Sequence, residues 1–239
     1  MLLRLLICSL LLATVICQSL MEIYKAMMED QARRLATNQI NIEIFGEASC
    51  PDTNRFFREQ LMPVWNALGS TNMLNVSYHP FGLASCLTSS DGIKCRCQHG
   101  PIECQMNQLQ ACVISALGIP QLYLPVVACL QGKRKMVKAV EECIVNVVPR
   151  PNLDENFMMS CAQSQLGAKL MMEHGRIQSG KADYVNWVPW IIINGRRSQA
   201  AEHQLKTIVC STPESARYEY CQNPSQKKKN VAVISVRYW

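Results

Sequence analysis

The chain has 239 residues and carries 24 Lys and Arg against 18 Asp and Glu, a formal net charge of +6. Hydrophobic residues make up 49% of the sequence, which excludes a largely disordered chain and allows a sizeable core. The charge is too small to indicate a nucleic-acid-binding protein. Thirteen cysteines indicate either metal binding or a compartment in which disulfides form.

Residues 1–17, MLLRLLICSLLLATVIC, have the pattern of a signal peptide. Arg4 precedes an apolar stretch, Leu5 to Ile16, that is too short to span a bilayer. We expect cleavage after Cys17 or as late as Ser19; an uncleaved membrane anchor is the alternative. No later stretch reaches about 18 uninterrupted apolar residues. We therefore expect no membrane span and a chain that enters the secretory pathway.

Apolar periodicity and turn residues predict a series of helices and strands after the signal peptide. In chain order these are a helix over 20–35, a strand over 40–45, a helix over 51–68, a strand over 73–78, a Cys-rich helical insert over about 89–160, a helix over 161–174, a strand over 187–193, a hairpin turn at Asn194-Gly195, a helix over 198–209 and a basic tail over about 223–239. The first strand–helix–strand stretch indicates a parallel α/β unit.

Eleven cysteines remain once Cys8 and Cys17 leave with the signal peptide, so one cannot pair within the chain. Cys50 is the candidate, because it lies where a strand ends and a helix begins. Unpaired N–H groups and the helix dipole favour a thiolate there, although the charge of Asp52 opposes it. Thr53 occupies the place of the second thiol of a C-x-x-C motif. The alternative is that Cys50 pairs with a distant cysteine.

The other ten cysteines are candidates for five structural disulfides, whose pairing the sequence leaves open. They are Cys86, Cys95, Cys97, Cys104, Cys112, Cys129, Cys143, Cys161, Cys210 and Cys221. Cys95, Cys97, His99 and Cys104 also cluster as zinc ligands do, but an oxidising compartment favours disulfides, so we expect no metal. His99 is then a turn or packing residue. We find no hydrolase spacing and no phosphate-binding loop, and we expect no cofactor.

Residues 97–112, CQHGPIECQMNQLQAC, match position for position the signature C-Q-H-G-x2-E-C-x2-N-x4-C of the gamma-interferon-inducible lysosomal thiol reductase (GILT) family. The matching residues are Cys97, Gln98, His99, Gly100, Glu103, Cys104, Asn107 and Cys112. The chain resembles this family from about Ile42 to Cys221. The resemblance implies an α/β, thioredoxin-like fold with a Cys-rich helical insertion, within residues 18–239. It also implies a secreted or lysosomal enzyme that reduces protein disulfides.

By this resemblance Cys50 is the attacking thiol, and Pro189 is a cis-proline that holds an extended substrate beside it. The alternative for Pro189 is a trans proline in an edge strand. Thr53 departs from the family's better-known members, which have a second cysteine there; its hydroxyl could still donate a hydrogen bond to the Cys50 thiolate. Release would then require a low-molecular-weight thiol or another thiol of the chain, for which Cys95 is a candidate.

The partners implied are disulfide-containing protein substrates and a low-molecular-weight thiol as reductant. A catalytically silent, disulfide-stabilised binding protein on the same scaffold is the alternative function. Asn75-Val76-Ser77 is the one N-glycosylation sequon of the sequence, and in a secreted chain we expect Asn75 to carry a glycan.

Overall fold

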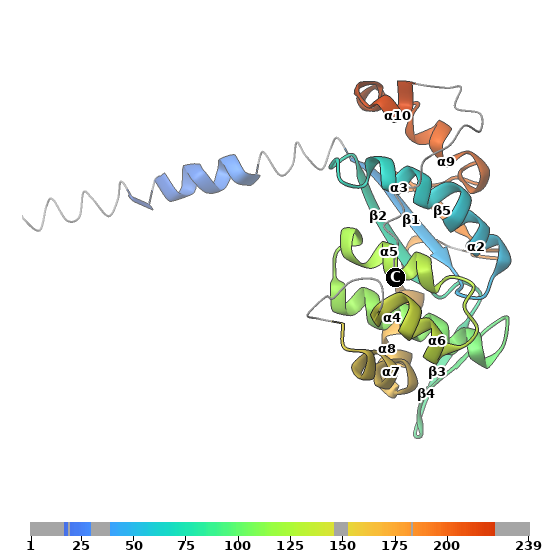
Figure 1. Cartoon of the computed structure of the whole chain (residues 1–239). Coiled ribbons are helices and arrows are strands. Elements are labelled where there is room, and N and C mark those ends of the chain that lie inside the picture. Colours follow the sequence, from blue (N-terminus) through green and yellow to red (C-terminus); the bar gives the residue numbers. More distant parts are fainter. Residues whose placement is uncertain (1–16, 19, 30–38, 146–152, 183, 223–239) are drawn as a thin grey trace, which may run out of the picture. The chain divides into compact units, whose positions relative to one another are not determined.

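The computed structural model describes residues 17–18, 20–29, 39–145, 153–182 and 184–222 (Figure 1). The chain divides into two units, Met1–Gln39 and Ile40–Trp239. In the first unit residues 17–18 and 20–29 are helical, which confirms the predicted helix as far as residue 29. The end of that helix, residues 1–16 of the predicted signal peptide and the basic tail over 223–239 lie outside the described residues.

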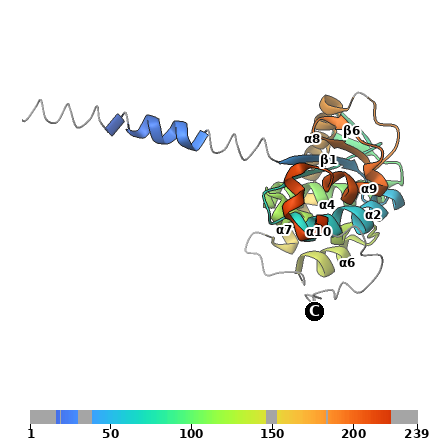
Figure 2. The same cartoon turned by 90° about the horizontal axis from the view of Figure 1, so that it is seen from above.

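A four-stranded sheet in the order β2-β1-β5-β6 lies at the centre of the second unit (Figures 1 and 2). Its strands are β1 (Ile40–Gly46), β2 (Leu74–Pro80), β5 (Trp190–Ile193) and β6 (Arg196–Arg197). Strands β1 and β2 are parallel, which confirms the predicted α/β unit. They are joined by a helical run made of α2 (Pro51–Phe56), the π-helical segment η1 (Phe57–Leu61) and α3 (Met62–Leu68).

Strand β5 runs antiparallel to β1 and turns back into β6 at Asn194-Gly195. Both residues of this turn have positive φ angles, 48° and 78°, as a tight hairpin turn requires. The predicted hairpin is therefore confirmed. The strand itself begins at Trp190 rather than at residue 187, directly after a cis peptide bond between Val188 and Pro189.

Successive residues of β1 and β2 point to opposite faces of the sheet. On one face Tyr78 stacks edge-on against Phe57 of η1, with ring centroids 4.9 Å apart. On the other face His79 and Glu43 bond to side chains of α8 (Gln165–Lys181), which are His174 and Lys181. Helices therefore cover both faces of the sheet (Figure 2).

The stretch between β2 and β5 is mainly helical. It contains α4 (Pro101–Leu117), α5 (Pro120–Leu130), α6 (Met136–Val140), the π-helical segment η2 (Glu141–Val145), α7 (Glu155–Gln163) and α8. The predicted single helix over 161–174 is wrong, because Ser164 ends α7 and its Oγ accepts the N–H of Leu166 to cap α8.

A hairpin of β3 (Ser85–Ser89) and β4 (Gly92–Arg96) precedes these helices. Residues 89–96 of the predicted helical insert are therefore not helical. The segment after β6 contains α9 (Ala201–Val209), the 3₁₀ helix η3 (Pro213–Arg217) and α10 (Glu219–Gln222).

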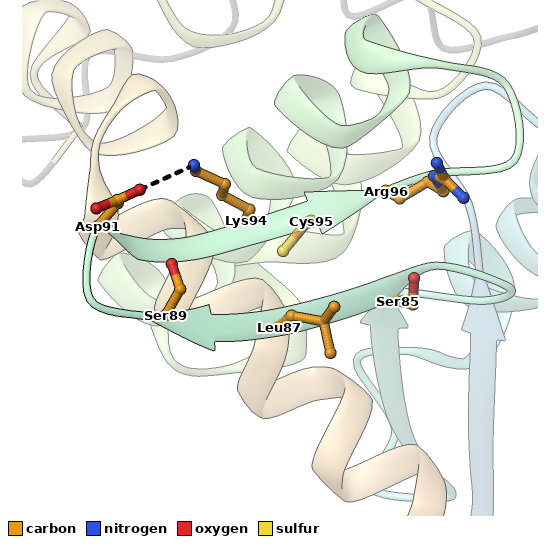
Figure 3. A pocket seen from close by; sticks show the side chains of 7 residues that line it. All are labelled: Ser85, Leu87, Ser89, Asp91, Lys94, Cys95 and Arg96. Carbon is orange, nitrogen blue, oxygen red and sulfur yellow. Dashed lines mark hydrogen bonds and ion pairs between the residues drawn. The ribbon is translucent and has the colours of Figure 1, made fainter.

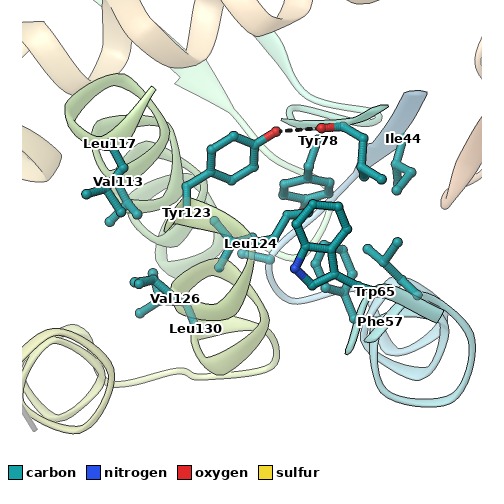
Figure 4. Close-up of a cluster of buried hydrophobic side chains, with 14 of the residues drawn as sticks. Ile44, Phe57, Trp65, Tyr78, Val113, Leu117, Tyr123, Leu124, Val126 and Leu130 are labelled. Carbon is teal, nitrogen blue, oxygen red and sulfur yellow. Dashed lines mark hydrogen bonds between the residues drawn. The ribbon is translucent and has the colours of Figure 1, made fainter. Parts of the chain in front are cut away.

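The main core lies between the sheet and the helices on the Tyr78 face (Figure 4). Ile44, Phe57 and Tyr78 meet residues of α4 and α5 there, and all three are nearly inaccessible to solvent. The hydroxyl of Tyr123 donates to the main-chain oxygen of Val76 at 3.0 Å, so this buried polar group is satisfied. This packing fixes the helical layer against the strands that carry the site.

Ten of the described cysteines form five disulfides. The pairs are Cys86–Cys95, Cys97–Cys104, Cys112–Cys161, Cys129–Cys143 and Cys210–Cys221. These are the ten cysteines that the sequence assigned to structural bridges. Among the described residues the unpaired cysteines are Cys17, within the predicted signal peptide, and Cys50.

Candidate active site

Cys50 is the N-cap residue of α2, and its main-chain oxygen accepts the N–H of Asn54 at 3.0 Å. Pro51 occupies the first helical position, where a missing N–H costs no hydrogen bond. The thiol therefore lies beside the free N–H groups and positive dipole end of a helical run that extends to Leu68. Only 6% of Cys50 is exposed, so access to the sulfur is narrow.

The Val188–Pro189 segment faces this thiol. The Sγ of Cys50 lies 3.7 Å from the main-chain oxygen of Val188, to which it donates. The Val188–Pro189 peptide bond is cis, as the resemblance implied, and the trans alternative is wrong. The structure thus brings together Cys50 and Pro189, which are 139 residues apart in the sequence.

Thr53 is fully buried on the inner side of the same helical turn. Its Oγ1 accepts the main-chain N–H of Glu47 at 3.5 Å. Among the described residues no hydrogen bond joins Thr53 to Cys50, so the expected contact to the thiolate is not present. A Cβ added at Gly46 would lie 2.7 Å from Cγ2 of Thr53, which shows how closely the strand passes this side chain.

A small polar cleft of about 230 Å³ continues from Val188 and Pro189 along the surface. The residues that line it are Asp52, Arg55, Trp187, Val188, Pro189, Glu202 and His203. The guanidinium of Arg197 stacks on the rings of Trp187 and Trp190, and Glu202 bonds to both Arg197 and the indole N–H of Trp187. These contacts hold the Trp187 side of the cleft together.

The run 97–112 contributes two of its cysteines to one bridge, Cys97–Cys104, which ties the turn before α4 to the first turns of that helix. Glu103 is fully buried and accepts two hydrogen bonds from His99, one from the main-chain N–H at 2.9 Å and one from Nδ1 at 2.6 Å. His99 is exposed and is a turn residue, as expected. Cys112 joins α4 to α7 through Cys161.

Two further signature positions differ in what they contact. Asn107 is fully buried in α4, and its Oδ1 accepts the main-chain N–H of Ala48 at 2.8 Å. Gln98 is exposed and lies with Gly100, the N-cap residue of α4, on the wall of a shallow pocket beside the Cys97–Cys104 bridge. Gly100 has a φ of 90°, a conformation that glycine adopts readily.

Glu47 is a buried carboxyl group that the sequence analysis missed. It directly follows β1, its Oε1 accepts the N–H of Leu83 at 2.7 Å, and its Oε2 lies 3.3 Å from Nδ1 of His99. Burial and the neighbouring Glu103 raise the pKa of Glu47 to about 7, against the smaller opposing effects of Leu83 and His99. No local pattern distinguishes this glutamate, since the fold alone brings residues 47 and 99 together.

Glu47, His99 and Glu103 offer three atoms that lie within 4.8 Å of one another, the spacing of a metal-ligand set. The short hydrogen bond from His99 to Glu103 already occupies Nδ1. The zinc cluster weighed from the sequence is wrong, because Cys95, Cys97 and Cys104 are bound in disulfides.

Cys95 lies on the β3–β4 hairpin, directly opposite Cys86, to which it is bonded. Its sulfur faces a surface pocket of about 570 Å³, lined by the hairpin residues drawn in Figure 3. Because this sulfur is in a disulfide, the candidacy of Cys95 as a resolving thiol is not supported in this state of the chain.

Asn75 is exposed on β2, which is an edge strand of the sheet. Its Nδ2 donates to Oδ1 of Asn41 on the neighbouring strand at 2.8 Å. Because Asn75 is exposed, its side-chain amide is accessible at the surface. Within the part of the chain that the structure describes, no helix is long and apolar enough to cross a membrane.

The crystal structure of Chlamydia trachomatis DsbA resembles this structure with a TM-score of 0.51, at 13% sequence identity, over 71% of this chain and 84% of that one. The fold is thus thioredoxin-like, with a Cys-rich helical insertion between β2 and β5. The candidate site consists of a free cysteine, Cys50, at a helix N-terminus and a cis-proline segment opposite it.

A family model described as "Gamma interferon inducible lysosomal thiol reductase (GILT)" matches residues 41–147. The GILT-like protein CBG03282 of Caenorhabditis briggsae is 40% identical over 186 residues, 77% of this chain and 83% of that protein. The GILT-like protein ZK669.3 of Caenorhabditis elegans is 40% identical over 187 residues, 77% and 84% of the two chains. The gamma-interferon-inducible lysosomal thiol reductase of Mus musculus is 26% identical over 171 residues, 72% and 66%. The chain belongs to the GILT family.

Proposed function

We propose that this member of a thiol reductase family reduces protein disulfides through Cys50. The observation that carries the proposal is the placement of Cys50, an unpaired cysteine at a helix N-terminus whose sulfur lies against Val188 and the cis-Pro189. The free N–H groups of α2 stabilise negative charge on the sulfur. The main chain at Val188–Pro189 supplies an edge beside which an extended substrate segment lies.

The first half of the reaction needs one thiol only. The Cys50 thiolate attacks one sulfur of the substrate disulfide and forms a mixed disulfide, while the other sulfur leaves as a thiolate and takes a proton from water. Thr53 has no thiol with which to complete the cycle. A low-molecular-weight thiol such as cysteine or glutathione then bonds to the Cys50 sulfur and frees the substrate. A second such thiol forms the small-molecule disulfide and restores Cys50.

The compartment is part of the proposal. Five disulfides and the predicted signal peptide support a chain in the secretory pathway, with a lysosomal or extracellular destination. Asn75, accessible on an edge strand, carries the glycan. Glycosidase treatment should lower the mass of the unsubstituted chain and leave the mass of Asn75→Gln unchanged.

The decisive experiment is a disulfide reductase assay with excess cysteine, across pH, on the unsubstituted chain, Cys50→Ser and Thr53→Cys. We expect Cys50→Ser to abolish activity, because it removes the nucleophile. We expect Thr53→Cys to increase turnover, because Thr53 lies one helical turn from Cys50 in a space that holds a side chain of similar size. Activity that survives Cys50→Ser would refute the mechanism.

Thr53 also favours a second candidate function, a disulfide-stabilised binding protein without turnover. On this alternative the unsubstituted chain shows no reduction of protein or small-molecule disulfides at any pH. A mixed disulfide trapped between Cys50 and a substrate protein, mapped by mass spectrometry, would exclude it.

A further inference from the structure

Residues 97–107 of the signature run contact the turn that leads to Cys50. None of them takes part in the proposed thiol–disulfide exchange. This turn, residues 47–49, links the end of β1 to the N-cap of α2. A shift of the turn after β1 moves Cys50 relative to Val188 and Pro189, which precede β5 on the neighbouring strand. The position of the turn therefore decides whether the sulfur meets a substrate held at Pro189.

Both main-chain polar groups of Ala48 are held by the helical layer. Its N–H donates to Oδ1 of Asn107 in α4 at 2.8 Å, and its oxygen accepts the N–H of Gly132 after α5 at 2.8 Å. Ala48 and Asn107 are both completely buried, so water does not replace either bond. The Nδ2 of Asn107 has no partner among the described residues, so the bond from Ala48 to Oδ1 is the polar contact that this buried side chain makes.

Glu47 is held by a second set of contacts, one of which comes from His99 of the same run. Oε2 lies 3.3 Å from His99, whose ring and main chain are fixed by Glu103, and Oε1 is bonded to Leu83. The main-chain N–H of Glu47 in turn bonds to Thr53. Glu47 thus joins the turn both to the signature run, through its side chain, and to the helix that begins after Cys50, through its main chain.

We propose that Asn107 and the His99–Glu103 pair are positioning residues for Cys50, which hold the turn over 47–49 so that the sulfur stays aligned with the cis-Pro189 segment. This rests on the proposed function of Cys50. The Cys97–Cys104 disulfide closes the short loop that contains His99 and Glu103. On this account the signature supports the nucleophile and does not itself react.

The test is the stoichiometric reaction of the full chain with a dipyridyl disulfide at about pH 5. Cys50 bonds to one pyridylthio group and the other leaves as coloured pyridinethione, with Cys50→Ser as the blank. We expect Asn107→Leu, which removes the acceptor for Ala48, to lower the rate constant by about tenfold or more, since small displacements of a reacting group have such effects. Asn107→Asp keeps an acceptor oxygen for the N–H of Ala48 and should stay within about threefold of the unsubstituted rate.

Matched variants separate positioning from folding. Gln105→Ala changes an exposed residue of the same helix and should react like the unsubstituted chain. His99→Ala changes an exposed side chain, so it tests the second contact set even if Asn107→Leu fails to fold, and we expect a reduction of about threefold or more. Unchanged rates in Asn107→Leu and His99→Ala would overturn the inference. If the unsubstituted chain reacts no faster than Cys50→Ser, the proposed function fails instead, and the inference falls with it.

Discussion

The buried carboxyl group of Glu47 predicts a specific pH dependence of stability. Its pKa is about 7 in the folded chain, whereas the ordinary value is 4.5. The folded state therefore binds this proton more tightly than the unfolded state. The stabilising contribution is complete below pH 4.5 and is lost as the pH rises through about 7. At about 1.4 kcal/mol for each pH unit between the two pKa values, the loss amounts to about 3 kcal/mol.

Glu47→Gln removes this dependence because an amide does not ionise, while its oxygen still accepts the N–H of Leu83. Between pH 5 and pH 8 we expect the fall in the free energy of unfolding to be about 3 kcal/mol smaller in the variant than in the parent. Urea unfolding followed by tryptophan fluorescence measures this. A Cys50→Ser background prevents thiol–disulfide exchange in the unfolded chain.

Glu43→Gln is the matched control. Burial acts to raise the pKa of Glu43, but hydrogen bonds and charges from His79 and Lys181 outweigh it and lower the pKa. The contribution of Glu43 is therefore present above its ordinary pKa and is lost only as the pH falls through the lowered value. Because Glu43→Gln leaves the carboxyl group of Glu47 unchanged, the variant should keep the contribution of Glu47 to the loss above pH 5. Equal slopes in Glu47→Gln and its parent would refute the assignment of a proton to Glu47.

Two further predictions concern the bridges and the cleft. Replacing Cys112 and Cys161 by serine opens a loop with a sequence separation of 49 residues and should lower the free energy of unfolding by about 4 kcal/mol. The same change at Cys210 and Cys221, separated by 11, should lower it by about 3 kcal/mol. Urea unfolding measures both losses, and an equal or reversed order would contradict the loop argument. Trp187→Ala removes the outer ring of the cleft wall, so KM for a protein disulfide should rise about threefold or more while the rate with a dipyridyl disulfide stays unchanged. A loss in both assays would instead mean that the wall positions Cys50.

The sequence predicted the elements whose signal is local. Alternating isoleucines predicted β1, and Asn194-Gly195 predicted the β5–β6 hairpin, because each depends on residues next to one another in the chain. The β3–β4 hairpin was missed, since its residues are mostly exposed and show no apolar alternation. The break at Ser164 was missed as well, because the apolar period continues on either side of the cap.

By itself the sequence determined the number of cysteines, the odd count among them and the family signature, and from these Cys50 as the candidate nucleophile. Which cysteines pair was left to the tertiary structure, because pairing depends on distances across the fold. The partners of Thr53 and the neighbours of Glu47 were also decided by the tertiary structure. A buried carboxyl group and a signature helix meet at the turn before Cys50, and a cis-proline segment meets its sulfur, only because the sheet and the helical layer pack together. No pattern along the chain records that packing.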